Sequence, residues 1–157
     1  HPTTALCLEA FAQAQTSGWL QPSMRFLDLG TGSGILGIGL CRLGLTGVGL
    51  DIDPQAVWCA ADNLRLNGVE GSMSLAVGGV GSLAPDSRFE VVAANILAAP
   101  LMAMARLLVR HVAPGGLLVL SGLLETQADD VAAAYQATGL GQPERRVSGE
   151  WASLSWR

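Results

Sequence analysis

Short apolar runs alternate along the chain with longer segments in which apolar residues recur at helical spacing. The run FEVVAANI (89–96) is apolar at consecutive positions, which is typical of a strand buried on both faces of a parallel sheet. The segment DPQAVWCAADNLRLNG (53–68) carries a helix start signal, Asp53 followed by Pro54, and a stop signal at Gly68. The whole pattern predicts strands over 24–30, 46–52, 72–77, 89–96 and 117–122, and helices over 3–15, 33–44, 53–68, 99–112 and 125–138.

The end of the chain follows a different pattern. A turn is expected at APGG (113–116), and the segments PERRVS (143–148) and EWASLSW (150–156) are typical of an antiparallel hairpin. Because strands and helices alternate before this hairpin, we expect one α/β domain with a mostly parallel, seven-stranded, doubly wound sheet and helices on both faces. The length of 157 residues fits a single domain. Ligands of such sheets bind at the carboxyl ends of the strands.

The first predicted strand runs into a glycine-rich turn, FLDLGTGSGILGIGL (26–40), which fits two patterns. Gly30, Gly32 and Gly34 form a GxGxG that follows Asp28. Gly32, Gly34 and Gly37 instead form the GxGxxG of dinucleotide-binding proteins. The two patterns imply different ligands, and a third possibility is that the glycines serve only close packing of helix on strand.

Asp28 separates the two ligands. A dinucleotide would bring its pyrophosphate to the start of the next helix, where a carboxylate two residues before the first glycine would repel it. S-adenosylmethionine has no phosphate and carries a sulfonium and an ammonium group, so Asp28 is expected to pair with its cationic end. Gly30 and Gly32 would let the backbone approach this cofactor. The sequence therefore favours a methyl donor over NAD.

Two more polar residues end predicted strands. Asp51 can accept hydrogen bonds from both ribose hydroxyls of an adenosine ligand. The alternative is that Asp51 is simply a solvated residue at the end of a strand. Asn95 can orient a substrate amine toward the methyl carbon, or else cap the following turn. Asn95 is thus our candidate catalytic residue. The role of Glu150 and Trp151, which begin the last strand, stays open between the pocket rim and an edge strand.

Composition narrows the function further. The net charge of −4 argues against generic nucleic-acid binding but is compatible with a basic protein partner. All nine basic residues are arginines, so no lysine acts as base or Schiff-base former. The three cysteines, Cys7, Cys41 and Cys59, lack metal-ligand spacing and are expected to be buried in a reducing compartment. No metal site, membrane span or signal peptide is expected, and the cytoplasm is the expected location.

Several segments together resemble the catalytic domain of the PrmA family of bacterial ribosomal protein methyltransferases. They are, in chain order, HPTTALCLE, LDLGTGSGILGIG, GLDIDPQAV, DNLRLNGV, VVAANILAAPL, APGGLLVLSGLLETQ and GEW. The resemblance implies a class I, Rossmann-like methyltransferase fold over residues 1–157. It also implies methyl transfer from S-adenosylmethionine to lysine and α-amino nitrogens of a ribosomal protein. Thr4, Gly30, Asp51 and Asn95 would then contact the cofactor, and Thr4 is known only from this resemblance.

The chain also departs from that family. A glycine-rich stretch and an N-terminal substrate-recognition domain precede the HPTT of the family, so we expect this chain to be a C-terminal part without that domain. The turn AVGGVGS (76–82) has no acidic residue where many methyltransferases hold the adenine amine. Alternatives are a methyltransferase of the same fold that acts on a small molecule or a protein amide, and an orphaned S-adenosylmethionine-binding domain.

Overall fold

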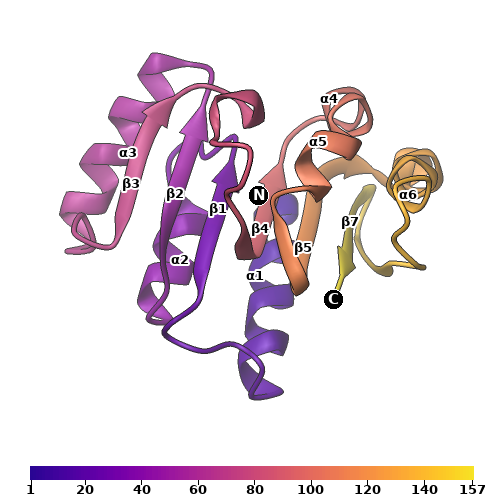
Figure 1. Ribbon diagram of the computed structural model, residues 1–157, viewed down its shortest axis with the longest axis horizontal. Coiled ribbons are helices and arrows are strands. Elements are labelled where there is room, and N and C mark those ends of the chain that lie inside the picture. The colour runs from indigo at the N-terminus through magenta and orange to yellow at the C-terminus, as the bar shows by residue number, and fades with distance from the viewer.

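The computed structural model describes all residues, 1–157, and has a seven-stranded sheet at its centre (Figure 1). The sheet order is β3-β2-β1-β4-β5-β7-β6, in which β7 runs antiparallel to β5 and β6, and every other neighbouring pair is parallel. This confirms the expected sheet with its C-terminal hairpin. The strands are β1 (Arg25–Leu29), β2 (Thr46–Asp51), β3 (Met73–Val77), β4 (Phe89–Asn95), β5 (Val112–Leu124), β6 (Glu144–Ser148) and β7 (Trp151–Trp156).

Helices cover both faces of the sheet, and each face has its own apolar core. Cys7, Leu40 and Leu64 belong to the core between the sheet and the first three helices. Leu101 and Val131 belong to the core on the opposite face. The helices are α1 (Pro2–Thr16), α2 (Ile35–Arg42), α3 (Pro54–Leu66), α4 (Ala98–Ala103), α5 (Ala105–Val109) and α6 (Ala128–Gln136), with short 3-10 turns at Val80–Ser82 and Glu125–Gln127.

Most predicted elements are confirmed, and their local signals act as expected. The Asp53 side chain caps α3 by accepting a hydrogen bond from the Gln55 amide at 2.9 Å. The inner residues of β4, Val91 to Ala94, are fully buried, as expected for a central strand. No helix in the chain has the length and apolar character needed to cross a membrane.

The predicted helix over 99–112 is wrong, because the segment forms two short helices that break at Met104. Ala98, Leu101, Ala105 and Leu108 all face the core at helical spacing, so the apolar pattern continues through the bend and does not reveal it. The expected turn at 113–116 lies inside the bounds of β5, where the register with β4 shifts and the segment bulges out.

The expectation that all three cysteines are buried is also wrong for one of them. Cys7 and Cys41 lie in the core, whereas Cys59 is exposed on α3. In α3 the two fully buried residues are Ala60 and Leu64, which face the sheet. Cys59 lies beside this face, and the helical pattern alone did not separate the two positions.

Tyr135 ties α6 to α4. Its ring is fully buried, and its hydroxyl donates a hydrogen bond to the Leu101 carbonyl at 2.8 Å. Removing the hydroxyl leaves a buried carbonyl without a partner, which typically costs about 1–3 kcal/mol. We therefore expect Tyr135→Phe to lower the free energy of unfolding by that amount in urea denaturation. Thr16→Val removes the exposed hydroxyl bond to Ala12 and is the control, with an expected change below ~0.5 kcal/mol. Equal effects of the two substitutions would contradict this role of Tyr135.

Candidate functional site

The predicted site residues at strand ends come together at one rim of the sheet. β1, β2 and β4 are parallel neighbours, and Leu29 is in register with Leu50 on one side and Ala94 on the other. The turn after β1 therefore begins between the ends of the two flanking strands, which carry Asp51 and Asn95. The amides of Gly30 and Thr31 both donate to the Leu50 carbonyl, at 2.8 and 2.9 Å, and bend the turn toward β2.

The glycine turn has a backbone that side chains would not tolerate. Gly30, Gly32 and Gly34 all have positive φ, and Gly34 is the N-cap residue before α2. Gly30 has a second reason to be glycine, since a Cβ at this position would overlap Cγ2 of Ile96. Gly37 lies outside the turn, within α2, where a side chain would displace the end of Met73. The glycines of the turn itself are therefore those of the GxGxG.

Asp28 lies directly beneath this turn. The residue is 1% exposed, and its Oδ2 accepts hydrogen bonds from Thr31 Oγ1 at 2.7 Å and from the Gly37 amide at 3.1 Å. Burial, with a smaller contribution from the nearby charge of Asp51, raises its pKa to about 6 against the opposing effect of the two hydrogen bonds. Both hydrogen bonds involve the same carboxylate oxygen and fasten Asp28 to the turn and to α2. The expected pairing of Asp28 with the cationic end of a ligand stays a prediction.

Asp51 holds the turn from the β2 side. Its Oδ2 accepts from the Gly32 amide at 2.9 Å, and its Oδ1 accepts from the Asp53 amide at 3.0 Å. The side chain is partly exposed, and an ionised carboxylate has about four acceptor positions. Two of these positions are taken, so Asp51 retains capacity for two further donors.

Asn95 and the start of α1 share one corner of the rim. Alternation along β4 puts Asn95 on the same face as Val91 and Ala93, which pack in the core beneath α1. Thr4, in the first turn of α1, is partly exposed. That Thr4 and Asn95 serve one site stays a prediction.

The start of β7 lies at the same end of α1. The ring of Trp151 contacts the ring of His1 edge-on, with centroids 5.0 Å apart and an angle of 71° between planes. Trp151 therefore stands beside the α1 end of the site. Glu150 is exposed in the turn before β7, and its carbonyl accepts a hydrogen bond from the Glu125 amide.

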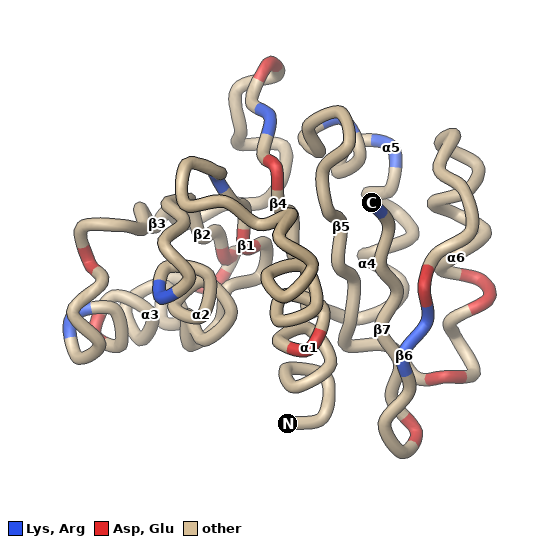
Figure 2. The backbone as a smooth tube through the Cα atoms, turned by 90° about the horizontal axis from the view of Figure 1, so that it is seen from below, with Lys and Arg blue, Asp and Glu red and all other residues tan.

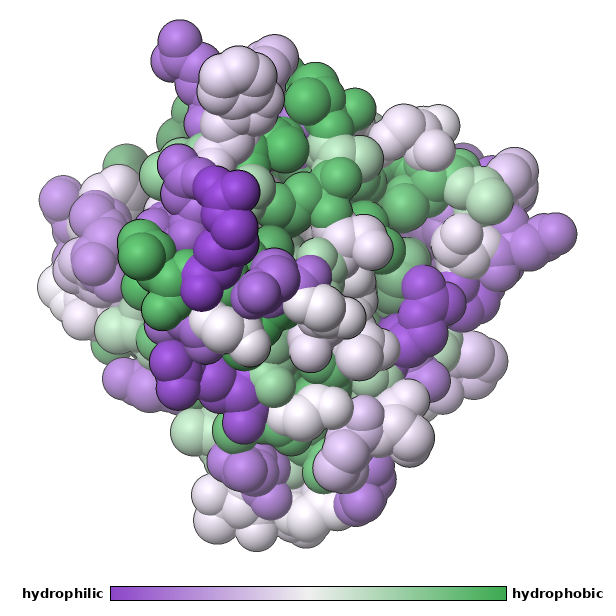
Figure 3. Space-filling view, turned by 90° about the vertical axis from the view of Figure 1, so that its left-hand side faces the viewer, coloured by the Kyte–Doolittle hydropathy of each residue, from purple (hydrophilic) through white to green (hydrophobic).

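Sequence reasoning missed four residues that shape this rim. Thr31 bonds Asp28, and Asn63 Nδ2 donates to the Ser33 carbonyl at 2.8 Å. Ile52 and Val77 follow or end strands at the rim and are 81% and 53% exposed. Figure 3 shows the side of the molecule that includes α3 and β3, where apolar and polar residues are intermixed. The position of Thr31 between two glycines could have indicated its role in the turn. Nothing in the sequence marks an exposed apolar residue at a strand end, such as Ile52 or Val77, as part of a site.

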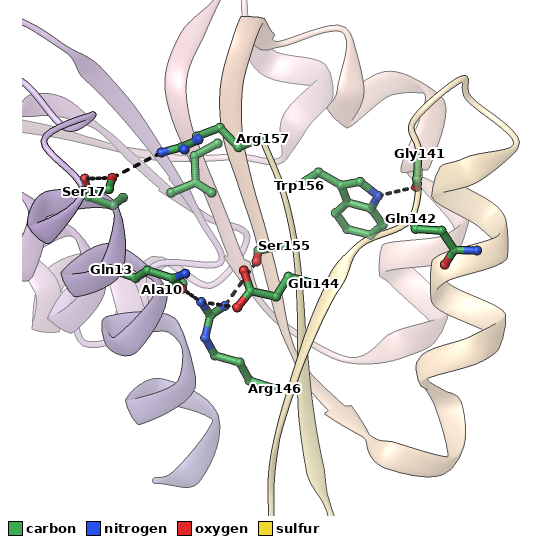
Figure 4. Close-up of a pocket in the computed structure, with 12 residues that line it drawn as sticks. Ala10, Gln13, Ser17, Gly141, Gln142, Glu144, Arg146, Ser155, Trp156 and Arg157 are labelled. Carbon is green, nitrogen blue, oxygen red and sulfur yellow. Dashed lines mark hydrogen bonds and ion pairs between the residues drawn. The ribbon is translucent and has the colours of Figure 1, made fainter.

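A cavity of about 390 Å³ lies away from this rim (Figure 4). It is bordered by the C-terminal half of α1 and the end of β7, and contains none of the predicted site residues. Its Arg146 is already paired with Glu144 at 2.8 Å and hydrogen-bonded to Gln13 and Ser155. The charge of this arginine is thus satisfied within the protein. No group of three or more His, Cys, Asp or Glu side chains could hold a metal ion.

The raised pKa of Asp28 gives a prediction for stability. The folded-state pKa of about 6 lies above the ordinary value of 3.8, so the folded protein binds this proton more tightly than the unfolded chain. Asp28 therefore makes the protein less stable as pH rises from about 4 to about 6, by on the order of 2–3 kcal/mol. Asp28→Asn keeps an oxygen for both donors and lacks this titration.

We expect the Asp28→Asn variant to match the wild type near pH 4 and to exceed its unfolding free energy by a widening margin up to about pH 7. Urea denaturation of both proteins across this range measures the margin. A margin that does not change with pH would show that Asp28 is not protonated in this way.

Comparison with known proteins identifies the family. The family described as ribosomal protein L11 methyltransferase (PrmA) matches residues 1–157. The ribosomal protein L11 methyltransferase of Ralstonia nicotianae is 51% identical over 137 residues, which cover 86% of this chain and 42% of the relative. The chain spans about half the length of the curated relatives it matches.

Solved structures agree with the sequence comparison. The ribosomal protein L11 methylase of Lactobacillus delbrueckii subsp. bulgaricus matches with a TM-score of 0.89 and 27% identity, covering 99% of this chain and 78% of that chain. An RNA methyltransferase of Salinibacter ruber in complex with S-adenosyl-L-homocysteine has the same fold, with a TM-score of 0.72, 24% identity, and coverage of 99% and 89%. The expected class I methyltransferase fold is confirmed. The chain belongs to the ribosomal protein L11 methyltransferase (PrmA) family.

Proposed function

We propose that this chain is the catalytic domain of an S-adenosylmethionine-dependent methyltransferase that modifies lysine and α-amino nitrogens of ribosomal protein L11. The observation that carries the proposal is the hydrogen bond from Gly32 to Asp51, which joins the glycine turn to an acidic strand end at 2.9 Å. Asn95 ends the strand on the other side of that turn. S-adenosylmethionine and the amine that accepts its methyl group would meet between Asp51 and Asn95.

Residues along the rim suit the ribose, the adenine ring and the methionine part of this cofactor. Asp51 has acceptor capacity left for the two ribose hydroxyls. Ile52 and Val77 offer exposed apolar surface beside it for the adenine ring, and Gly79 lies against Ile52. The backbone of Gly30 and Gly32 would approach the methionine part, with Thr4 near its end. Adenosine-type ligands use such sites at the carboxyl ends of parallel strands.

The charges of the rim disfavour a pyrophosphate. Asp28 and Asp51 both hold the glycine turn through carboxylate oxygens, so a dinucleotide would bring its negative charge close to two acidic groups. The bound donor supplies an electrophilic methyl group on a positively charged sulfur. Asp28 would contribute by shaping the turn and through its negative charge, which favours the cationic methionine part of the cofactor.

Asn95 would orient the acceptor. Its side-chain oxygen can accept a hydrogen bond from an N–H of the amine, which directs the nitrogen lone pair toward the methyl carbon. The new C–N bond forms as the C–S bond breaks, and the nitrogen then loses a proton. The amine would lose its charge to water as it enters, favoured by desolvation.

Recognition of the protein substrate would lie outside this chain. The curated relatives are about twice as long, and the part that this chain does not span would hold the ribosomal protein. The net charge of −4 suits a basic protein partner, and the arginine positions are scattered rather than continuous (Figure 2). We therefore propose a cytoplasmic location with the ribosomal substrate, and neither direct nucleic-acid binding nor a membrane partner.

Ligand choice is the first test. Calorimetry should show binding of S-adenosylmethionine and S-adenosylhomocysteine to the 157-residue chain and none of NAD. Asp51→Ala should weaken cofactor binding by roughly 1.5–3 kcal/mol, the range for hydrogen bonds to a charged group. Asp53→Ala is the matched control, since it should lose about 1 kcal/mol of stability as a helix cap and keep its affinity. NAD binding without a methyl-donor signal would overturn the proposal.

Asn95 should matter for turnover more than for cofactor retention. We expect Asn95→Ala to bind S-adenosylhomocysteine nearly as the wild type does and to lose on the order of a hundredfold in rate. Radiolabelled methyl incorporation into ribosomal protein L11 measures the rate. The assay uses a chimera in which this chain replaces the matching part of the Ralstonia nicotianae relative. Full activity of the variant would remove Asn95 from the mechanism, and full activity of the isolated chain would contradict a separate recognition part.

A further inference from the structure

Ile96, the residue after Asn95, lies between two glycines from distant parts of the chain. Its Cγ2 methyl packs on Gly30 so closely that a Cβ there would overlap it. Its backbone packs on Gly122, where a Cβ would lie 2.5 Å from the Ile96 carbonyl oxygen and 2.9 Å from its nitrogen. Real Cβ atoms do not approach other atoms this closely, so both neighbours of Ile96 must be glycine.

β5 fixes the backbone of Ile96 on the Gly122 side. The Ile96 amide donates to the Ser121 carbonyl at 3.2 Å, and Asn95 is in register with Ser121. Ser121 is itself fully buried, and its hydroxyl donates to the Ala152 carbonyl. The Asn95–Ile96 backbone is therefore held from β5. Just beyond the last pair of β1 and β4, Leu29 and Ala94, the Ile96 side chain fills the space against Gly30 at the start of the glycine turn.

The glycine turn is held independently of Ile96. Asp28 bonds Thr31 and the Gly37 amide from beneath, and Asp51 bonds the Gly32 amide from the β2 side. Loss of the Ile96 methyl would thus leave the turn in place. What would change is the distance between the turn and Asn95.

We propose that Ile96 is a positioning residue whose Cγ2 methyl sets the separation between the cofactor turn and the Asn95 amide. The proposal rests on the function proposed above, in which Asn95 orients the acceptor amine over a donor bound at the turn. Small errors in the placement of reacting groups have large effects on rate. The affinity for the cofactor is governed by the turn and by Asp51, and is little affected.

Two substitutions separate this role from simple filling of space. Ile96→Val keeps a methyl on Cβ at the Cγ2 position and loses volume. Ile96→Leu keeps the volume and loses that methyl. A residue that only fills the core tolerates the volume-conserving change better, whereas a spacer tolerates valine better. In the chimera, we expect valine to keep kcat within about threefold and leucine to lose about 10- to 100-fold, with S-adenosylhomocysteine affinity within about threefold for both.

Glycine substitutions provide a second, matched pair. Gly122 has φ +85° and Gly18 has φ +80°, so an alanine introduces similar backbone strain at either position. Gly18 has nothing within 4 Å of its would-be Cβ, whereas an alanine at 122 pushes on the Ile96 backbone. Both variants should be less stable, and only Gly122→Ala should also lose kcat.

The side-chain amide of Asn95 reports its position without any turnover. In ¹⁵N spectra of the 157-residue chain, its signals should shift in the leucine variant and stay in the valine variant. Unmoved signals together with full turnover in the leucine variant would overturn the role of Ile96, as would better turnover with leucine than with valine. If the signals move as expected and the wild-type chimera transfers no methyl group, the proposed function fails and the placement of Asn95 by Ile96 stands.

Discussion

Two carboxylates hold the turn between β1 and α2 in place, Asp28 through the Thr31 hydroxyl and the Gly37 amide of α2, and Asp51 through the Gly32 amide. Asp28 bonds it from beneath and Asp51 from the side, so the end of β1, the end of β2 and the start of α2 are fixed by one set of hydrogen bonds. Every other feature of the rim is placed relative to this turn. Gly30 packs on Ile96, and Ile96 adjoins Asn95, which links the turn to the central strand. Shifting the turn would therefore displace both halves of the proposed site.

Holding the turn in this way works against the stability of the fold. A carboxylate that is almost fully buried has lost its hydration, and its raised pKa records that the two hydrogen bonds do not fully offset the loss. A neutral group of the same shape would suit the core better. Buried positions normally hold apolar or neutral side chains. A charged group that is kept at such a position is the pattern expected at a functional site, where function rather than folding determines the residue.

The sequence was informative where the chemistry is local. The cap at Asp53, the apolar run of β4 and the order of elements follow from short-range patterns, and the positions of Asp51 and Asn95 follow from the rule that parallel strands end at one rim. The direction of the Asp28 side chain depends on where Thr31 and Gly37 fold back, and the break at Met104 leaves the apolar spacing intact. Such features arise from packing between elements, which no single segment encodes.

The direction of α1 has a consequence for how the fold accepts additions. The helix begins beside Trp151, at the rim of the sheet that carries Asn95, and ends at the opposite side, near the cavity that Gln13 lines. Any polypeptide joined before His1 would thus emerge beside the Asn95 corner of the proposed site and need no long connection to reach it. Polypeptide joined after Arg157 would emerge at the far rim, because β7 runs antiparallel to β5. The fold therefore favours one of its ends for a substrate-binding module, and the other for attachments that leave access to the site free.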